Sequence, residues 1–140
     1  MTKKIFKSSI LVAAAVLIFG IACVMAILYQ HFGKQIDTEL KKEATYLAYG
    51  VEQNGVDYLN QIKEKDDRIT YIAEDGTVLY DNQADASSME NHSDRKEVQE
   101  ALKSGSGRAE RDSKTLSQKT IYYALRLSDN TVLRVSSTRY

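Results

Sequence analysis

An uncharged apolar run near the N-terminus constrains this chain more than any other feature. Residues 10–28 read ILVAAAVLIFGIACVMAIL and contain no charged side chain. At about 1.5 Å per residue, a helix over this run is about 28 Å long, which matches the hydrocarbon core of a bilayer. A helix of a soluble domain would keep a polar face, and this run has none. The sequence therefore predicts a transmembrane helix over residues 10–29.

The residues before the run set the expected topology. Lys3, Lys4 and Lys7 precede it without any acidic residue. The positive-inside rule then places residues 1–9 in the cytoplasm and residues 30–140 outside, with a single pass through the cell membrane in this segment. The alternative is a cleaved signal peptide, whose apolar region would span about 7–15 residues. We favour the uncleaved helix because the run is longer and stays apolar after Cys23.

Composition excludes several classes of partner and site. Lys and Arg number 19, as do Asp and Glu, and three of the lysines lie before the apolar run. The remainder is mildly acidic, which is not typical of a nucleic-acid-binding protein. Cys23 is the only cysteine, so the chain forms no internal disulfide and no cysteine metal site.

A helical region is expected over residues 30–66. Apolar side chains recur there at near-helical spacing, at Ile36, Leu40, Leu47 and Val51. This stripe has two compatible interpretations, namely packing on the chain's own core and packing on a second copy in a homodimer that carries a signal. Asn54-Gly55 interrupts the pattern, and a shorter helix is expected to follow and to end near Lys65.

Residues 67–140 carry the pattern of a small sheet. Strands are predicted over residues 68–73, 78–80, 107–112, 119–127 and 131–136, the first two as a hairpin and the third at an edge. Asp94 and Glu97 fit a capping box that starts a short helix ending at Ser104-Gly105. The predicted fold class is α+β, with a five-stranded antiparallel sheet and the residue 30–66 helix on one face.

The polar loop between the second strand and the short helix has three interpretations. It is a solvated loop leading to a helix cap, one wall of a small-ligand pocket, or a metal site. Its potential ligands are Asp81, Asp85, Glu90, His92 and Asp94. Their spacing matches no calcium loop, and zinc would require more histidine or cysteine, so we predict no metal. No catalytic constellation and no phosphate-binding loop is found either.

Several segments resemble a known family. "RITYIAEDGTVLYDN", "MENHSDRKEVQEAL", "SGRAERDSKTL" and "YYALRLSDNTVLRVS", behind a lysine-flanked membrane helix, resemble the extracytoplasmic sensor of bacterial membrane histidine kinases. The type that they resemble is the phosphate-response (PhoR-like) kinase of Gram-positive bacteria. The resemblance implies a PAS-like or single-Cache sheet domain that receives an extracellular small molecule or protein. It also implies a kinase module that uses ATP and Mg²⁺ and passes phosphate to a response regulator.

No kinase motif is present in these 140 residues. The family's phospho-accepting histidine is followed by Arg-Thr-Pro, and the chain has no proline. This segment alone is therefore expected to be no enzyme and to hold no cofactor. A chemoreceptor or cyclase-type receptor and a stand-alone membrane-anchored binding module remain alternatives. In related sheet domains the ligand lies between sheet and loop, which makes these residues candidates for a signal pocket: Glu90, Asn91, His92, Arg111, Tyr122 and Tyr123.

Overall fold

The computed structural model describes residues 2–62, 67–112 and 118–139. The chain divides into two compact units, residues 1–37 and 38–140, which are described separately. Helix α1 (Thr2–Asn54) contributes to both units. In the first unit its large apolar side chains from Ile5 to Phe32 are exposed, as expected of a helix surrounded by lipid. By length and composition α1 is a candidate membrane span, and it is the only such helix among the described residues.

The second unit is built on one five-stranded sheet. Its strands are β1 (Arg68–Ile72), β2 (Val78–Asp81), β3 (Ser106–Asp112), β4 (Lys119–Arg126) and β5 (Val132–Arg139). Their order is β2-β1-β5-β4-β3, and every neighbouring pair is antiparallel. This confirms the predicted α+β fold, including the β1–β2 hairpin and the edge position of polar β3.

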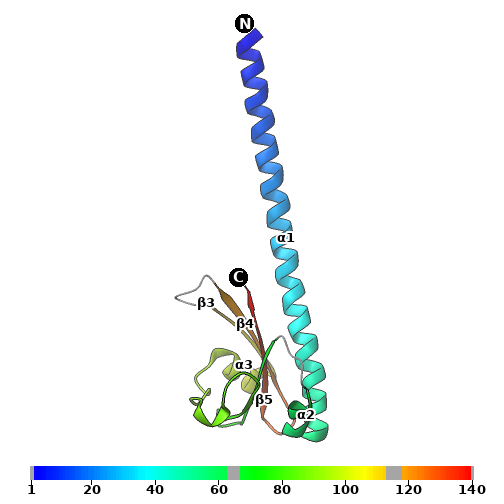
Figure 1. The fold of residues 1–140 in the computed structure, drawn as a ribbon, viewed down its shortest axis with the longest axis vertical. Helices are drawn as coiled ribbons and strands as arrows, with labels where there is room; N and C mark the ends of the chain where they lie inside the picture. The colour runs from blue at the N-terminus through cyan, green and yellow to red at the C-terminus, as the bar shows by residue number, and fades with distance from the viewer. Residues whose placement is uncertain (1, 63–66, 113–117, 140) are drawn as a thin grey trace. The chain divides into compact units, whose positions relative to one another are not determined.

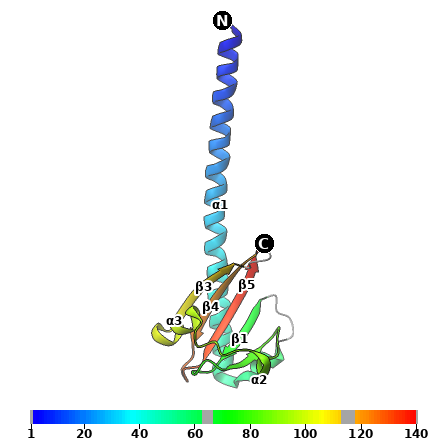
Figure 2. The same cartoon turned by 90° about the vertical axis from the view of Figure 1, so that its left-hand side faces the viewer.

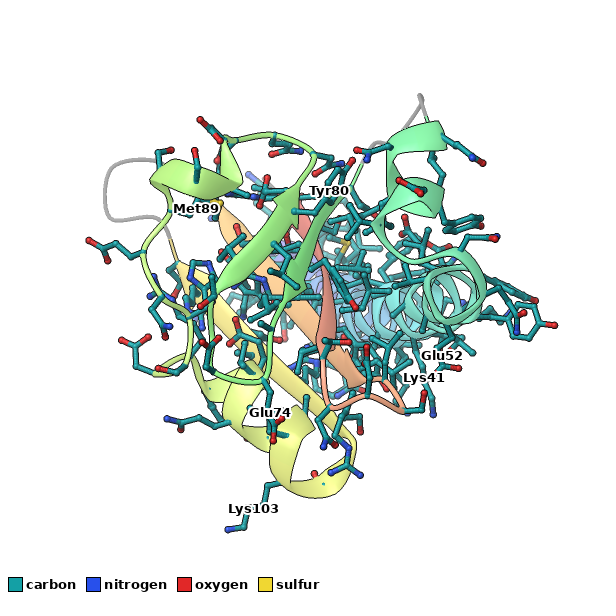
Figure 3. The ribbon with its side chains drawn as sticks, turned by 90° about the horizontal axis from the view of Figure 1, so that it is seen from below. Lys41, Glu52, Glu74, Tyr80, Met89 and Lys103 are labelled. Atoms are coloured by element: carbon teal, nitrogen blue, oxygen red, sulfur yellow. The ribbon has the colours of Figure 1, made fainter. Side chains whose placement is uncertain are left out.

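Helices cover both faces of this sheet. From Thr38 onward α1 lies along one face, and α3 (Lys96–Ser104) lies on the other (Figures 1 and 2). Glu52 ties α1 to the β4–β5 turn, because its Oε1 accepts a hydrogen bond of 2.9 Å from the Ser128 N–H (Figure 3 labels Glu52). Two short helices, α2 (Val56–Gln61) and the 3₁₀ helix η1 (Ala86–Ser88), complete the unit. The predicted end of the second helix near Lys65 lies outside the described residues.

The apolar stripe of α1 is buried within a single chain. Leu40, Leu47 and Val51 are only 2%, 7% and 4% exposed, and Ile36 is 8% exposed. For the three in the second unit, burial supports the core interpretation, and a dimer contact through them would require them to leave that core. Their part in a dimer stays a prediction.

The predicted start of α3 is wrong. The N-cap is Arg95, one residue after Asp94, and no side chain caps the helix. The capping box fails because the Glu97 side chain does not turn back to the helix start; it binds arginines of the sheet. The predicted end is confirmed, since Gly105 takes a left-handed conformation with φ of 99° after Ser104.

Candidate functional site

A buried carboxylate lies at the centre of the face that α3 covers. Glu97, in the first turn of α3, is 0% exposed. Its Oε1 accepts hydrogen bonds of 3.0 Å from Nη1 of both Arg111 (β3) and Arg134 (β5), and its Oε2 accepts a second one from Arg111. Burial alone would raise the pKa of Glu97, but the hydrogen bonds and positive charge of Arg111 and Arg134 lower it below the ordinary value of 4.5. Glu97 is therefore an anion held by two guanidinium groups.

Arg134 extends this cluster across the sheet. Its side chain is 5% exposed, and its Nη2 donates a hydrogen bond of 3.3 Å to Thr70 Oγ1 on β1. Its Nε is buried and has no hydrogen-bond partner among the described residues. Burial lowers the pKa of Arg134 despite the opposing effect of Glu97. The buried guanidinium of Arg134 has lost its contact with water, so it requires the Glu97 carboxylate as a counter-charge.

The network continues to the far edge of the sheet. Thr70 Oγ1 donates a 2.9 Å hydrogen bond to Asp81 Oδ2 on β2, and Arg68 Nε donates one of the same length. Burial opposes ionisation of Asp81, but hydrogen bonds from Gln83 N–H, Thr70 and Arg68 hold its pKa below the ordinary value. Side chains of β3, β5, β1 and β2 are thus joined to α3 by one chain of polar contacts.

Tyr122 of β4 supports both arginines of the cluster. The guanidinium carbon of Arg111 lies 4.4 Å from its ring centroid, and that of Arg134 lies 4.8 Å away. These are cation–π distances, and desolvation strengthens such contacts. We name Arg111, Tyr122, Arg134 and Glu97 the arginine cluster.

His92 lies close to the arginine cluster and is 5% exposed. Its Nδ1 is 2.8 Å from the carbonyl oxygen of Glu90, and its backbone N–H donates to the Gly76 carbonyl at 2.8 Å. Burial and, next, the positive charge of Arg134 lower the pKa of His92 below its ordinary value of 6.5. A buried histidine facing a cation is neutral at pH 7.

The structure brings together only some of the residues predicted to line a pocket. Arg111 and Tyr122 belong to the arginine cluster, and His92 lies beside it. Asn91 is exposed and holds the hairpin turn, since its Nδ2 donates to the Asp75 carbonyl at 3.0 Å. Tyr123 follows Tyr122 in a strand and therefore faces the opposite side of the sheet. Glu90 is exposed, and its carbonyl serves His92.

Sequence reasoning missed two charged members of the arginine cluster, Glu97 and Arg134. Glu97 was assigned to a helix cap, and Arg134 was not singled out within its predicted strand. The signal for Arg134 was available, because it is the only charged residue in the segment TVLRVSS, residues 131–137. A charge between buried strand residues requires a partner. Nothing in the sequence identified that partner as Glu97.

A polar pocket adjoins the arginine cluster on the same face. It has a volume of about 450 Å³, and Tyr122 forms part of its wall. The rest of its wall comes from Asp67, Arg68, Gln83, Thr120, Ser136, Ser137 and Thr138. It shares only Tyr122 with the pocket predicted from sequence. Within the described ranges, no three His, Cys, Asp or Glu side chains are grouped so that they could hold a metal ion.

The fold and this site define a class of protein. Helix α1 contains the candidate membrane span, and the sheet of the second unit carries a short helix and a polar pocket on one face. Residues 30–133 match the family model of single Cache-like domains, and the chain belongs to that family. No curated protein matches the chain. The protein is thus a Cache-type sensor with a candidate N-terminal transmembrane helix, and such domains sense ligands outside the cell.

Proposed function

We propose that this chain is the extracytoplasmic input segment of a two-component sensor histidine kinase of the PhoR-like type. The observation that carries the proposal is helix α1, which contains both the membrane candidate and the residues that cover the sensor sheet. A signal molecule or protein partner binds outside, and α1 conveys the change inward. The kinase module, with its ATP, Mg²⁺ and response regulator, acts in the cytoplasm.

The proposed mechanism is a shift between two arrangements of the sensor. A ligand moves such an equilibrium only by binding one arrangement more tightly than the other. The arginine cluster supplies a contact that can differ between them, because it fixes α3 to β3 and β5 through Glu97. Binding next to Tyr122 would change the environment of both arginines at once.

The proposal includes a homodimer, as sensor kinases transmit signals between paired chains. Because Leu40 and Leu47 are buried, the dimer would use another face of α1. Tyr46 and Tyr49 are 73% and 69% exposed and lie three residues apart on the helix. We expect Tyr49→Cys to form disulfide-linked dimers in oxidised membranes and Leu47→Cys to form none; the reverse result would place the buried stripe at the interface.

Two measurements test the kinase assignment. The first is the DNA sequence that follows the codon for Tyr140, and the second is phosphorylation of the full-length protein that this reading frame encodes. We expect a second apolar segment, a histidine-bearing helix and an ATP-binding module. Membranes containing that product should incorporate phosphate from ATP into an acid-labile, base-stable linkage. A methyl-accepting or cyclase module would assign the sensor to a chemoreceptor or cyclase instead, and an immediate stop codon would make it a stand-alone binding module.

A further inference from the structure

The polar pocket beside the arginine cluster has a lining rich in hydroxyl groups. Thr120 and Thr138 are directly opposed on β4 and β5, and Tyr122 is opposed to Ser136 on the same strands. Residues two apart in a strand face the same side, so these four lie on one face of the sheet. The Oγ1 atoms of Thr120 and Thr138 are 3.1 Å apart. The pocket wall is therefore a row of groups that both donate and accept hydrogen bonds.

The charges in the wall balance. Asp67 and Arg68 contribute one acid and one base, and Arg68 is already bound through Nε to Asp81 at 2.9 Å. Among the described residues, the other contact of its guanidinium is a weak one of 4.0 Å from Nη2 to the Met89 sulfur (Figure 3 labels Met89). Within the described residues its Nη atoms make no other hydrogen bond, and the pocket has no excess of positive charge to select an anion.

The wall also differs from the usual lining of small-molecule sites, which is mostly apolar with a few polar groups. Here every residue of the wall is polar, and Gln83 adds an amide to the hydroxyls. An apolar ligand would leave these groups without hydrogen-bond partners, which is costly. A ligand that itself carries many hydroxyl groups would satisfy them, and a volume of about 450 Å³ lies in the range of small-molecule sites.

We propose that this pocket binds a small uncharged polyhydroxylated ligand, a sugar or a polyol. The proposal rests on the sensory role given above and names the chemical class of the signal. Hydroxyl groups of the ligand bind Thr120, Ser136 and Thr138. Gln83 and Arg68 bind it from the β1–β2 side. Tyr122 forms a wall of the pocket and also supports Arg111 and Arg134, so occupancy acts directly on the contacts that hold α3.

The experiment uses the full chain in lipid nanodiscs and saturation-transfer NMR with D-glucose, N-acetyl-D-glucosamine and myo-inositol as probes. Succinate and inorganic phosphate are the anionic comparators. We expect saturable binding of at least one hydroxylated probe below about 50 mM, a range that a few hydrogen bonds support. Thr138→Val and Gln83→Leu each remove one hydrogen-bonding group from an exposed residue. Each should weaken binding about fivefold.

Thr45→Val is the matched control, because Thr45 is an exposed threonine of α1 outside the pocket and bonds only the carbonyl of Lys41 among the described residues. It should leave affinity unchanged. The proposal is overturned if no hydroxylated probe binds, if Thr138→Val and Gln83→Leu leave binding unchanged, or if only succinate or phosphate binds. A product that phosphorylates itself but binds no sugar refutes the ligand class alone. A product that binds sugar but has no kinase module refutes the kinase assignment alone.

Discussion

Glu97 Oε1 and Arg134 Nη1 lie 3.0 Å apart, although 37 positions separate the two residues in the sequence and both are buried. The pair joins α3 to β5, and Arg111 brings β3 to the same carboxylate. One acidic side chain therefore fixes the position of α3 on the sheet. The stability of the sensor unit should depend on it more than on other acids of the same helix.

Replacing Glu97 with Gln should destabilise the sensor unit strongly. The amide keeps the size of the side chain but leaves Arg134 buried without a counter-charge, which costs about 3–5 kcal/mol in comparable buried pairs. Thermal unfolding of the purified chain in detergent, followed by circular dichroism, measures the change. Glu100→Gln is the control, because Glu100 lies on the same helix with a side chain 44% exposed and should cost less than about 1 kcal/mol. A cost for Glu97→Gln as small as that expected for Glu100→Gln would mean that the cluster adds no stability.

Gly107 allows α3 to approach β3 closely. A Cβ at this position would collide with the carbonyl oxygen of Glu97 and lie 2.9 Å from Glu100 Cβ. Gly107→Ala should therefore push α3 away from the sheet and cost about 1–3 kcal/mol, as overpacking does. Gly33→Ala in α1 meets nothing within 4 Å and should be neutral or slightly stabilising. The same thermal unfolding measurement compares them, and an unchanged melting temperature for Gly107→Ala would contradict the close packing.

His92 should make the stability of the sensor unit depend on pH between neutrality and weak acid. Its pKa is lower in the folded state than its ordinary value of 6.5, so the unfolded chain binds the proton more readily. Stability is complete above about pH 6.5 and falls as the pH drops toward the folded pKa. Glu97 and Asp81 act in a lower window, because their pKa values lie below the ordinary 4.5 and 3.8.

His92→Gln should remove the loss of stability that begins below about pH 6.5, while leaving in place the fall that Glu97 and Asp81 cause at lower pH. Unfolding at a series of pH values measures it. His31→Gln serves as the control, because His31 is the only other histidine and is exposed. If wild type and His92→Gln lose stability in parallel from pH 7 to pH 5, burial and the charge of Arg134 do not lower the pKa of His92 in the folded protein.

The sequence predicted the fold more fully than the site, for a physical reason. In β4, apolar residues such as Ile121 and Tyr123 alternate with others, and Gly76 marks a turn. Both are local patterns, which can be recognised within a short stretch of sequence. Contacts within the arginine cluster join residues far apart in the chain. Arg111 and Tyr122 became candidates because related sheet domains hold their ligand between sheet and loop. Glu97 was not recognised because a local capping pattern, which the structure does not use, already accounted for it.

The expected membrane topology can be tested with a single introduced thiol. Glu74 is exposed in the β1–β2 turn, and Cys23 is the only native cysteine, within the apolar run (Figure 3 labels Glu74). If residues 30–140 lie outside the cell, Glu74→Cys in intact cells should react with a membrane-impermeant maleimide. The wild-type chain should remain unlabelled, because lipid shields Cys23. Thr2→Cys should react only after the cells are opened, since the lysine-rich N-terminus stays in the cytoplasm. Labelling of Thr2→Cys but not Glu74→Cys in intact cells would invert the topology and exclude an extracellular signal.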